Sequence, residues 1–352
     1  MKRSSMRILS FVLFLFVISL PWANAEVPAQ LFDKEFCSAF MLSGEDAVIY
    51  DTVYTGGRLY AVMGAEKYGY SGSGEIYYYD VEANEYGFLT KVKPRAYGSE
   101  KNWKDQTNEE KLTQDNRVFQ LIGAIDTGML YGFNPASGHI GAIDQDGIHW
   151  SETKLDTALL IEFADTLPQN LSMPFIDGNA LYGYASPNMF SAEDANCSPE
   201  GLLLSFDLTT GVCRSVYLPD TYAFCPYTPG KALLLRRMSS GRLFLSTFDL
   251  NTLTIEHDTF AKLPVSSSGT SWFDVCLDTA DIGGLSYCAE TDTIFALGKA
   301  GLWQSIAGAA FEMKDTDWPD HFFGGTMLDW LTIKQSWAMP DGSLVRGSEL
   351  IR

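Results

Sequence analysis

The chain of 352 residues carries 44 acidic and 25 basic side chains, so its net charge at pH 7 is −19. A surface with this charge repels nucleic-acid phosphates and anionic lipids. The composition therefore excludes nucleic acid as a partner and disfavours binding to anionic membranes.

The N-terminus has the three parts of a secretory signal peptide. Lys2, Arg3 and Arg7 form a positive start, Ile8–Leu20 is a short apolar run, and Ala23-Asn24-Ala25 is a small-x-small cleavage site. The apolar run is too short to cross about 30 Å of hydrocarbon, and no later segment is apolar enough to span a membrane. We expect cleavage after the 25th residue and a mature chain, 26–352, that is one domain with a net charge of −22. The predicted location is secreted, periplasmic or cell-surface.

Six cysteines lie in this mature chain, and an even number in an exported protein permits disulfides. Six cysteines allow 15 complete pairings, so the sequence does not fix the connectivity. Cys276 and Cys288 flank a polar turn and form the predicted local pair, while reduced buried cysteines remain the alternative. The cysteine and histidine spacings do not match those of zinc sites.

A repeated pattern of strands and turns begins near Ala47. In each copy an apolar strand follows a Gly or Asp turn, and a later strand ends in an Asp followed by a polar turn. The segments "YYDVEANEYGFL", "SFDLTTGVCRSV" and "TFDLNTLTIEHD" align directly on this Asp. We expect the Asp side chain to close the turn through the backbone, and the alternating apolar residues to bury one strand face. The copies are Thr55–Leu89, Asp126–Glu152, Asp177–Pro219, Pro229–Phe260, Thr291–Ile306 and Gln335–Ile351.

These copies recur every 40 to 55 residues, roughly, which is the spacing of four-stranded propeller blades. The pattern resembles the β-propeller repeats of secreted proteins in the YVTN, WD40 and quinoprotein-like group, although the Gly-His and Trp-Asp signature of true WD40 blades is absent. The resemblance implies an all-β propeller of six or seven four-stranded blades. A β-sandwich is the alternative, because short strands at this spacing also suit two packed sheets.

Three segments bear on how such a ring closes and where its loops lie. Phe36–Asp51 is the predicted closing strand, which pairs with the last blade and removes the open edges. A chain that is the front portion of a longer protein is the alternative. The insertions Lys91–Asn116 and Pro187–Glu200 fall between strands, and we expect them to form loops on one face.

The stretch "DGIHW", from Asp146 to Trp150, resembles a degenerate Asp-box turn of sialidase-like propellers, from which Gln145 and His149 depart. In those families the motif is a structural turn away from the active site. The resemblance implies that Asp146 caps backbone N–H groups, that Gly147 takes a positive φ, and that Trp150 packs into the blade.

No cofactor is expected for this chain, and calcium at one of two acidic clusters is the alternative. Asp144 and Asp146 form the first, but they lack the third ligand and the downstream Glu of an EF-hand loop. Asp274, Asp278 and Asp281 form the second, which also lacks a defined motif. Calcium binding at either cluster is a hypothesis, since acidity alone does not build a cation cage.

Catalytic motifs are weak in this sequence. Gly69–Gly74 nearly matches G-x-S-x-G, but it lacks the strand-turn-helix context of a nucleophile elbow. The four histidines show no metal-ligand spacing. A pair of carboxylates for glycoside hydrolysis stays open, because such pairs come together only in three dimensions.

Aromatic residues supply the remaining candidates for ligand binding. They gather between Asp315 and Trp330 among acids and glycines, and one more Trp lies in the charged Lys91–Arg117 window. Ordinary packing between strands is the alternative, because aromatic residues are common in sheets. The candidate residues are Trp103, Trp318, His321, Phe322, Phe323 and Trp330.

A repeat without a catalytic motif predicts a secreted, non-enzymatic propeller that binds a ligand or a protein, as a scaffold or as part of an exported solute-binding or cell-surface system. The partner is expected to be a protein or a carbohydrate. The alternative function is a propeller enzyme that acts on glycans, which the Asp-box-like turn and the aromatic cluster favour.

Overall fold

The computed structural model describes fourteen stretches of the chain. They are residues 47–65, 74–83, 85–92, 120–135, 137–162, 171–185, 201–218, 221–237, 243–261, 282–298, 301–315, 336–340, 344–346 and 349–351. The predicted signal peptide lies outside these stretches. No helix of the described residues is long and apolar enough to cross a membrane.

The described strands form six antiparallel units, which we call blades 1 to 6. Blade 1 contains β1 (Ala47–Thr55), β2 (Arg58–Ala65), β3 (Gly74–Asp80) and β4 (Glu85–Val92). Blade 2 contains β5 (Gln120–Ala124), β6 (Leu130–Asn134), β7 (His139–Asp144) and β8 (Gly147–Lys154). Blade 3 contains β9 (Ser172–Asp177), β10 (Ala180–Ala185), β11 (Gly201–Asp207) and β12 (Cys213–Leu218). Blade 4 contains β13 (Thr221–Pro226), β14 (Lys231–Arg237), β15 (Leu243–Asp249) and β16 (Thr254–Phe260). Blade 5 contains β17 (Ile282–Cys288), β18 (Thr293–Gly298), β19 (Gly301–Ile306) and β20 (Glu312–Asp315). Blade 6 contains β21 (Ser336–Ala338), β22 (Leu344–Arg346) and β23 (Glu349–Ile351). A short helix, α4 (Ala158–Glu162), lies between blades 2 and 3.

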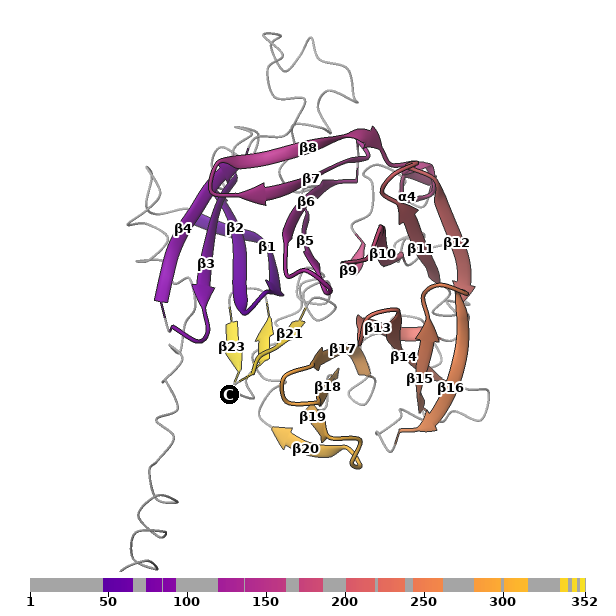
Figure 1. Cartoon of the computed structure of the whole chain (residues 1–352). Helices are drawn as coiled ribbons and strands as arrows, with labels where there is room; N and C mark the ends of the chain where they lie inside the picture. The colour runs from indigo at the N-terminus through magenta and orange to yellow at the C-terminus, as the bar shows by residue number, and fades with distance from the viewer. Residues whose placement is uncertain are drawn as a thin grey trace, which may run out of the picture.

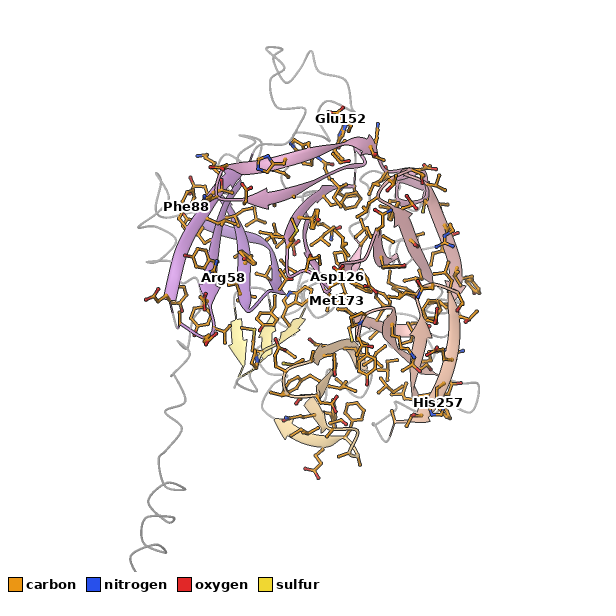
Figure 2. The ribbon with its side chains drawn as sticks, in the orientation of Figure 1. Arg58, Phe88, Asp126, Glu152, Met173 and His257 are labelled. Carbon is orange, nitrogen blue, oxygen red and sulfur yellow. The ribbon has the colours of Figure 1, made fainter. Side chains whose placement is uncertain are left out.

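The blades are arranged in a ring (Figure 1), which confirms the predicted β-propeller and rules out the two-sheet sandwich. The first strand of each blade faces the centre and the last strand of each four-stranded blade lies at the rim. In Figure 2, Asp126 and Met173 of the inner strands and turns lie near the centre, whereas Glu152 and His257 of the outer strands lie at the periphery. Blades 2 and 3 are also joined by parallel pairing of β5 with β9.

The burial of each strand follows its place in the blade. All of Ala232–Leu235 in β14 is buried, because neighbouring blades cover both faces of a middle strand. The outer strand β12 shows mostly exposed or half-buried residues, with only Leu218 fully buried. One apolar cluster contains residues from all six blades, and a second lies between blades 2 and 3. A middle strand such as β14 therefore contains a continuous apolar run.

Side-chain hydrogen bonds join the inner strands of neighbouring blades. The carboxylate of Asp51 in β1 accepts the N–H of Leu121 in β5 at 2.7 Å and that of Thr52 at 2.9 Å. Burial raises the pKa of Asp51 to about 7, although both N–H bonds act in the opposite direction. Gln120 both donates to and accepts from the backbone of Leu171, at 2.9 and 3.0 Å. These bonds satisfy buried backbone groups that the short parallel pairing between blades leaves open.

Blade 6 meets both of its neighbours through similar bonds. Ser286 of blade 5 accepts the N–H of Ala338 at 2.8 Å. The indole of Trp337 donates to the carbonyl oxygen of Thr52 in blade 1 at 2.9 Å. Since Trp337 and Thr52 are 285 residues apart, this bond closes the ring.

The expected closing segment is corrected in part. Ala47–Asp51 belongs to β1, the innermost strand of blade 1, and pairs with β2 instead of the last blade. Residues 36–46 lie outside the described stretches.

Strand order divides the ring into two ends. Each first strand runs to a tight turn, and each third strand runs to a second turn at the same end, which we call the turn face. The longer connections attach at the opposite end. Both insertions expected on one face attach there, because β4 ends at Val92 before one and β10 ends at Ala185 before the other. Their own residues lie largely outside the described stretches.

Candidate functional site: the turn face

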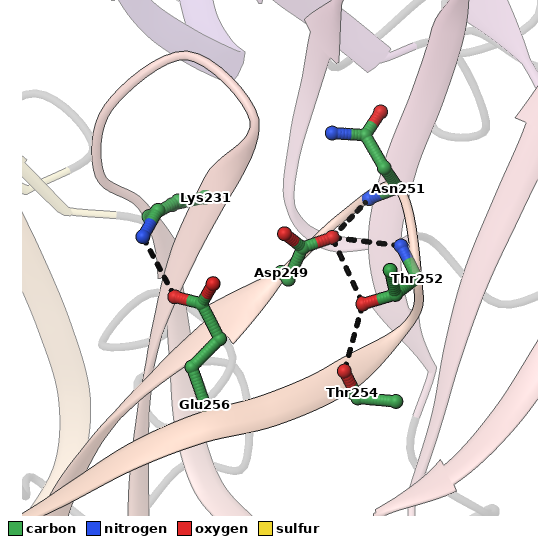
Figure 3. A network of polar contacts seen from close by, with 6 residues as sticks. All are labelled: Lys231, Asp249, Asn251, Thr252, Thr254 and Glu256. Carbon is green, nitrogen blue, oxygen red and sulfur yellow. Dashed lines mark hydrogen bonds and ion pairs between the residues drawn. The ribbon is translucent and has the colours of Figure 1, made fainter.

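The repeated Asp closes the second turn of blades 1 to 4, as the sequence predicts, whereas Ile306 stands at this position in blade 5. Asp249 accepts the backbone N–H groups of Asn251 and Thr252 at 2.9 and 2.7 Å, and the Thr252 hydroxyl at 3.0 Å (Figure 3). Asp207 accepts two N–H groups in the same way, from Thr209 and Thr210. These bonds, with that from the Thr252 N–H the largest cause, lower the pKa of Asp249 below its usual range. The motif therefore builds the turn and keeps a charged carboxylate on it.

The Asp-box-like turn has the same construction, with one correction. Asp144, and not Asp146, caps the turn by accepting the N–H of Asp146 at 2.8 Å. The second oxygen of Asp144 contacts Nε2 of His149 at 2.9 Å, and the two contacts lower the pKa of Asp144. Asp144 precedes the tight turn, so its side chain can accept the N–H two residues ahead, which the residue inside the turn does not face. Asp146 itself is exposed.

The other two expectations for this turn are confirmed. Gly147 has a φ of 128°. Trp150 is half-buried against the apolar cluster and meets the His139 ring edge to face at 6.2 Å between centroids. Among the described residues, no group of three or more His, Cys, Asp or Glu side chains could hold a metal ion. The Asp144 carboxylate contacts the backbone of its own turn and the ring of His149.

A second set of side chains lies where the first turns meet near the channel. Tyr54 at the end of β1 donates its hydroxyl to Oε1 of Glu290 in blade 5 at 3.2 Å. The thiol of Cys288 donates to Oε2 of the same carboxylate at 3.2 Å. Glu290 therefore links blade 1 to blade 5, across 236 residues of sequence.

Two tyrosines extend this set into blade 4. Tyr287 donates its hydroxyl to Asp292 at 3.1 Å. The ring of Tyr227 meets that of Tyr287 edge to face, with centroids 4.6 Å apart. We call Tyr54, Tyr227, Tyr287, Glu290 and Asp292 the tyrosine–carboxylate cluster.

Two groups of this region stay protonated at physiological pH. Burial, together with the nearby Asp292 carboxylate, raises the pKa of the Tyr287 hydroxyl, so it stays a neutral donor at physiological pH. Burial and the Glu290 carboxylate also raise the pKa of the Cys288 thiol. A thiol that stays protonated is a poor nucleophile. Carboxylates next to aromatic rings instead suit a cation, which both groups attract.

The charge of the turn face is strongly negative in the described residues. Its carboxylates are Asp80, Glu82, Glu85, Asp126, Asp144, Asp146, Asp177, Asp207, Asp249, Glu290, Asp292 and Glu312. The cations at this end are Arg58, Arg214 and Lys231. Arg58 is bound to Asp80 at 2.9 Å and lies over the Tyr78 ring, and Lys231 is bound to Glu256 at 2.7 Å. The remaining negative charge is open to a partner.

Most candidate residues of the sequence lie outside the described stretches, so their contacts stay predictions. They are Trp103, Asp274, Cys276, Asp278, Asp281, Trp318, His321, Phe322, Phe323 and Trp330.

The described cysteines are reduced. Cys288 has a free thiol that donates to Glu290, which gives the predicted pairing with Cys276 no support. Cys213 and Cys225 are free as well. Burial raises the pKa of Cys213 to about 12 and that of Cys225 still further from its ordinary value. Cys225 and Cys288 are buried and Cys213 is half-buried, so the described cysteines match the reduced alternative that the sequence left open.

Comparison with known proteins yields structural likeness only. No family model matches the sequence, and no curated protein matches it. A chain of the mitotic checkpoint complex is 13% identical with a TM-score of 0.45, over 88% of this chain and 76% of that one. A putative TolB from Agrobacterium tumefaciens is 10% identical with a TM-score of 0.43, over 88% and 92%. The propeller domain of the Trilobed protease from Pyrococcus furiosus is 10% identical with a TM-score of 0.39, over 86% and 79%. Function must therefore be argued from the residues of this chain.

Proposed function

We propose that this chain is a non-enzymatic binding module whose turn face receives a protein partner through lysine or arginine side chains. The observation that carries the proposal is the excess of turn-face carboxylates, whose few neighbouring cations are largely paired with carboxylates already. A face of one sign attracts an opposite charge over a distance of about a Debye length, roughly 8–10 Å at physiological salt. Such a field raises the rate of association and orients the partner.

The tyrosine–carboxylate cluster gives this face a place for a cationic side chain. Glu290 and Asp292 are exposed, and the rings of Tyr54, Tyr227 and Tyr287 are half-buried beside them. An ammonium or guanidinium group gains from a carboxylate and from the face of an aromatic ring together. The half-buried rings also stay in place before binding, which lowers the entropic cost of ordering the site.

The same proposal places the protein outside the cytoplasm, after removal of the first 25 residues. Its support is the three-part N-terminal sequence, and mass determination of the exported protein tests it: an N-terminus at Glu26 is expected, and an intact N-terminus in the cytoplasm would contradict it. The glycan-active alternative gains no support from the Asp-box-like turn, since that turn uses its Asp144 carboxylate on its own backbone.

The binding proposal is tested with a blocked peptide of alternating lysine and glycine, titrated into the mature chain. Binding is expected to weaken steeply between about 20 mM and about 300 mM salt, because exposed charges are screened. A peptide with glutamate in place of lysine serves as the control and should not bind. Equal binding of both peptides, or binding that salt leaves unchanged, would contradict the proposal.

Variants locate the interaction on the ring. Asp126→Asn removes one exposed charge near the channel, and we expect affinity for the lysine peptide to fall about twofold to fivefold. Glu75→Gln removes one charge from the start of β3, at the end opposite the turn face, and should leave affinity unchanged. A larger effect from Glu75→Gln would move the site away from the turn face.

A further inference from the structure

The second turn of blade 5 differs in its chemistry from the second turns of blades 1 to 4. Those turns carry the capping Asp, whereas residues 306–311 read "IAGAAF" and contain no polar side chain. The five consecutive residues from Ile306 to Ala310, which we call the apolar turn, are exposed, and Ile306 itself is 54% exposed. A run of exposed apolar residues is unfavourable in water and commonly marks a surface that a partner covers.

The apolar turn is held in place although its surface is exposed. The N–H of Ala307 donates to the carbonyl oxygen of Asp292 at 2.8 Å, which ties the second turn of blade 5 to the first. The N–H of Ala309 donates to the carbonyl oxygen of Ile306 at 3.0 Å. Phe311, the next residue after the turn, packs against the apolar cluster that contains residues from all six blades. A surface that is already ordered loses little conformational entropy when a partner covers it.

The backbone of the apolar turn favours a polar residue where the sequence has an apolar one. Ala307 has a φ of 48° and Gly308 a φ of 73°. Positive φ at both central residues of a tight turn is usual for Asn-Gly or Asp-Gly, because short polar side chains tolerate the left-handed region better than Ala does. Ala307 is therefore strained and keeps the surface of the turn apolar. Strain of this kind is found most often where a surface has a function.

Exposed carboxylates lie on both sides of the apolar turn. Ile306 is the cross-strand partner of Thr293, so the turn lies beside Glu290 and Asp292 of the tyrosine–carboxylate cluster. Glu312, at the start of β20, is exposed on its other side. A partner that covers the turn must bring cations, because a carboxylate that loses its water without gaining a counter-charge is destabilised. The same carboxylates oppose a second copy of this chain and an anionic lipid surface, since like charges would meet.

We infer that the apolar turn is the anchor of the partner interface, and that the partner segment carries an aliphatic side chain close to its lysine or arginine residues. The aliphatic side chain covers Ile306, and the neighbouring cation contacts Asp292 or Glu290. Cross-strand neighbours are about 5 Å apart and residues of an extended chain about 3.3 Å apart, so the two partner residues lie about one or two positions from each other. This inference rests on the proposed function, because it assigns the apolar part of the segment that the turn face receives.

The test compares two blocked peptides of equal charge, titrated into the mature chain. One is the lysine–glycine peptide, and the other has leucine in place of one central glycine. The leucine peptide is expected to bind about fivefold to tenfold more tightly, and this ratio should persist at about 150 mM salt, because salt does not screen apolar contacts. Equal affinity of the two peptides would overturn the anchor and leave the proposed function standing. Failure of both peptides to bind at low salt would overturn both.

Variants locate the preference for leucine on the ring. Ile306→Thr removes much of the exposed apolar side chain and keeps its branched shape, so the preference is expected to disappear while binding of the lysine–glycine peptide stays the same. Val212→Thr is the matched control, because Val212 is 56% exposed in the second turn of blade 3, and it should keep the preference. A preference that Ile306→Thr retains, or that both variants lose equally, would overturn the inference.

Two other occupants of the apolar turn are measured with the same variants. Phosphatidylcholine vesicles offer a neutral lipid surface, and sedimentation velocity of the mature chain reports self-association. Neither vesicle binding nor a dimer that depends on Ile306 is expected. Vesicle binding that Ile306→Thr abolishes would assign the turn to a lipid surface, and a dimer that it abolishes would assign the turn to a second copy. Either result would overturn the inference.

Discussion

Trp337→Phe is expected to weaken the junction between blade 6 and blade 1. The substitution removes the indole N–H that bonds the carbonyl of Thr52, and both residues are buried, at 7% and 2% exposure. A buried carbonyl left without a donor costs about 1–3 kcal/mol. The smaller ring leaves a cavity that adds about 1 kcal/mol. The expected loss in the free energy of unfolding is therefore about 2–4 kcal/mol, a large share of the stability of an ordinary domain.

Urea denaturation of the mature chain, followed by tryptophan fluorescence, measures this loss. Trp303→Phe is the matched control, because Trp303 of blade 5 is also buried and the substitution leaves a cavity of the same kind. It should lower the free energy of unfolding only by the contribution of the cavity. A loss for Trp337→Phe no larger than that for Trp303→Phe would refute ring closure through this bond.

Three further predictions concern titration and backbone conformation. Burial raises the pKa of Asp51 to about 7, so the folded chain keeps a proton that the unfolded chain releases above 3.8. The free energy of unfolding should therefore fall as pH rises from 3.8 towards 7, and Asp51→Asn should lack this slope; parallel pH profiles of the two proteins would contradict the assignment. The turn caps act in the opposite direction, since the pKa of Asp249 is lowered. The stabilisation by these caps is present above pH 3.8 and is lost as the pH falls through the lowered pKa. Asp249→Asn should therefore lose less thermal stability in acid than the unmodified chain. Equal acid sensitivity of the two proteins in thermal melts would contradict this prediction. Gly211→Ala should destabilise the chain by more than about 2 kcal/mol, because φ is 75° and the new Cβ would lie 2.2 Å from the carbonyl oxygen of Lys154. Gly57→Ala, with φ of 78° and open space around it, carries the backbone strain without the clash, and an equal cost in urea denaturation would show that packing at Gly211 is loose.

The repeat and its Asp turns could be predicted from the sequence because they are local. Asp207 and Asp249 bind N–H groups two and three residues ahead, so the motif contains all of its partners. The apolar run of β14 likewise reflects burial on both faces of a middle strand. The prediction of Asp146 as the cap was wrong, because the capping residue depends on where the tight turn begins. A shift of the turn by one residue exchanges Asp144 and Asp146 in this role.

The candidate site could not be predicted in the same way. Tyr54 and Glu290 are 236 residues apart, and only the closure of the ring brings them together. Trp337 and Thr52 meet for the same reason.

The most direct test of the proposed function is hydrogen exchange on the mature chain with and without the lysine–glycine peptide. Exchange reports protection segment by segment, so it shows which end of the ring the cation occupies. The proposal predicts slower exchange at the first turns of blades 2 and 5, residues 125–129 and 289–292, and no change at the start of β9 or β13. Protection confined to those strand starts would place the partner at the opposite end and contradict binding through the turn face.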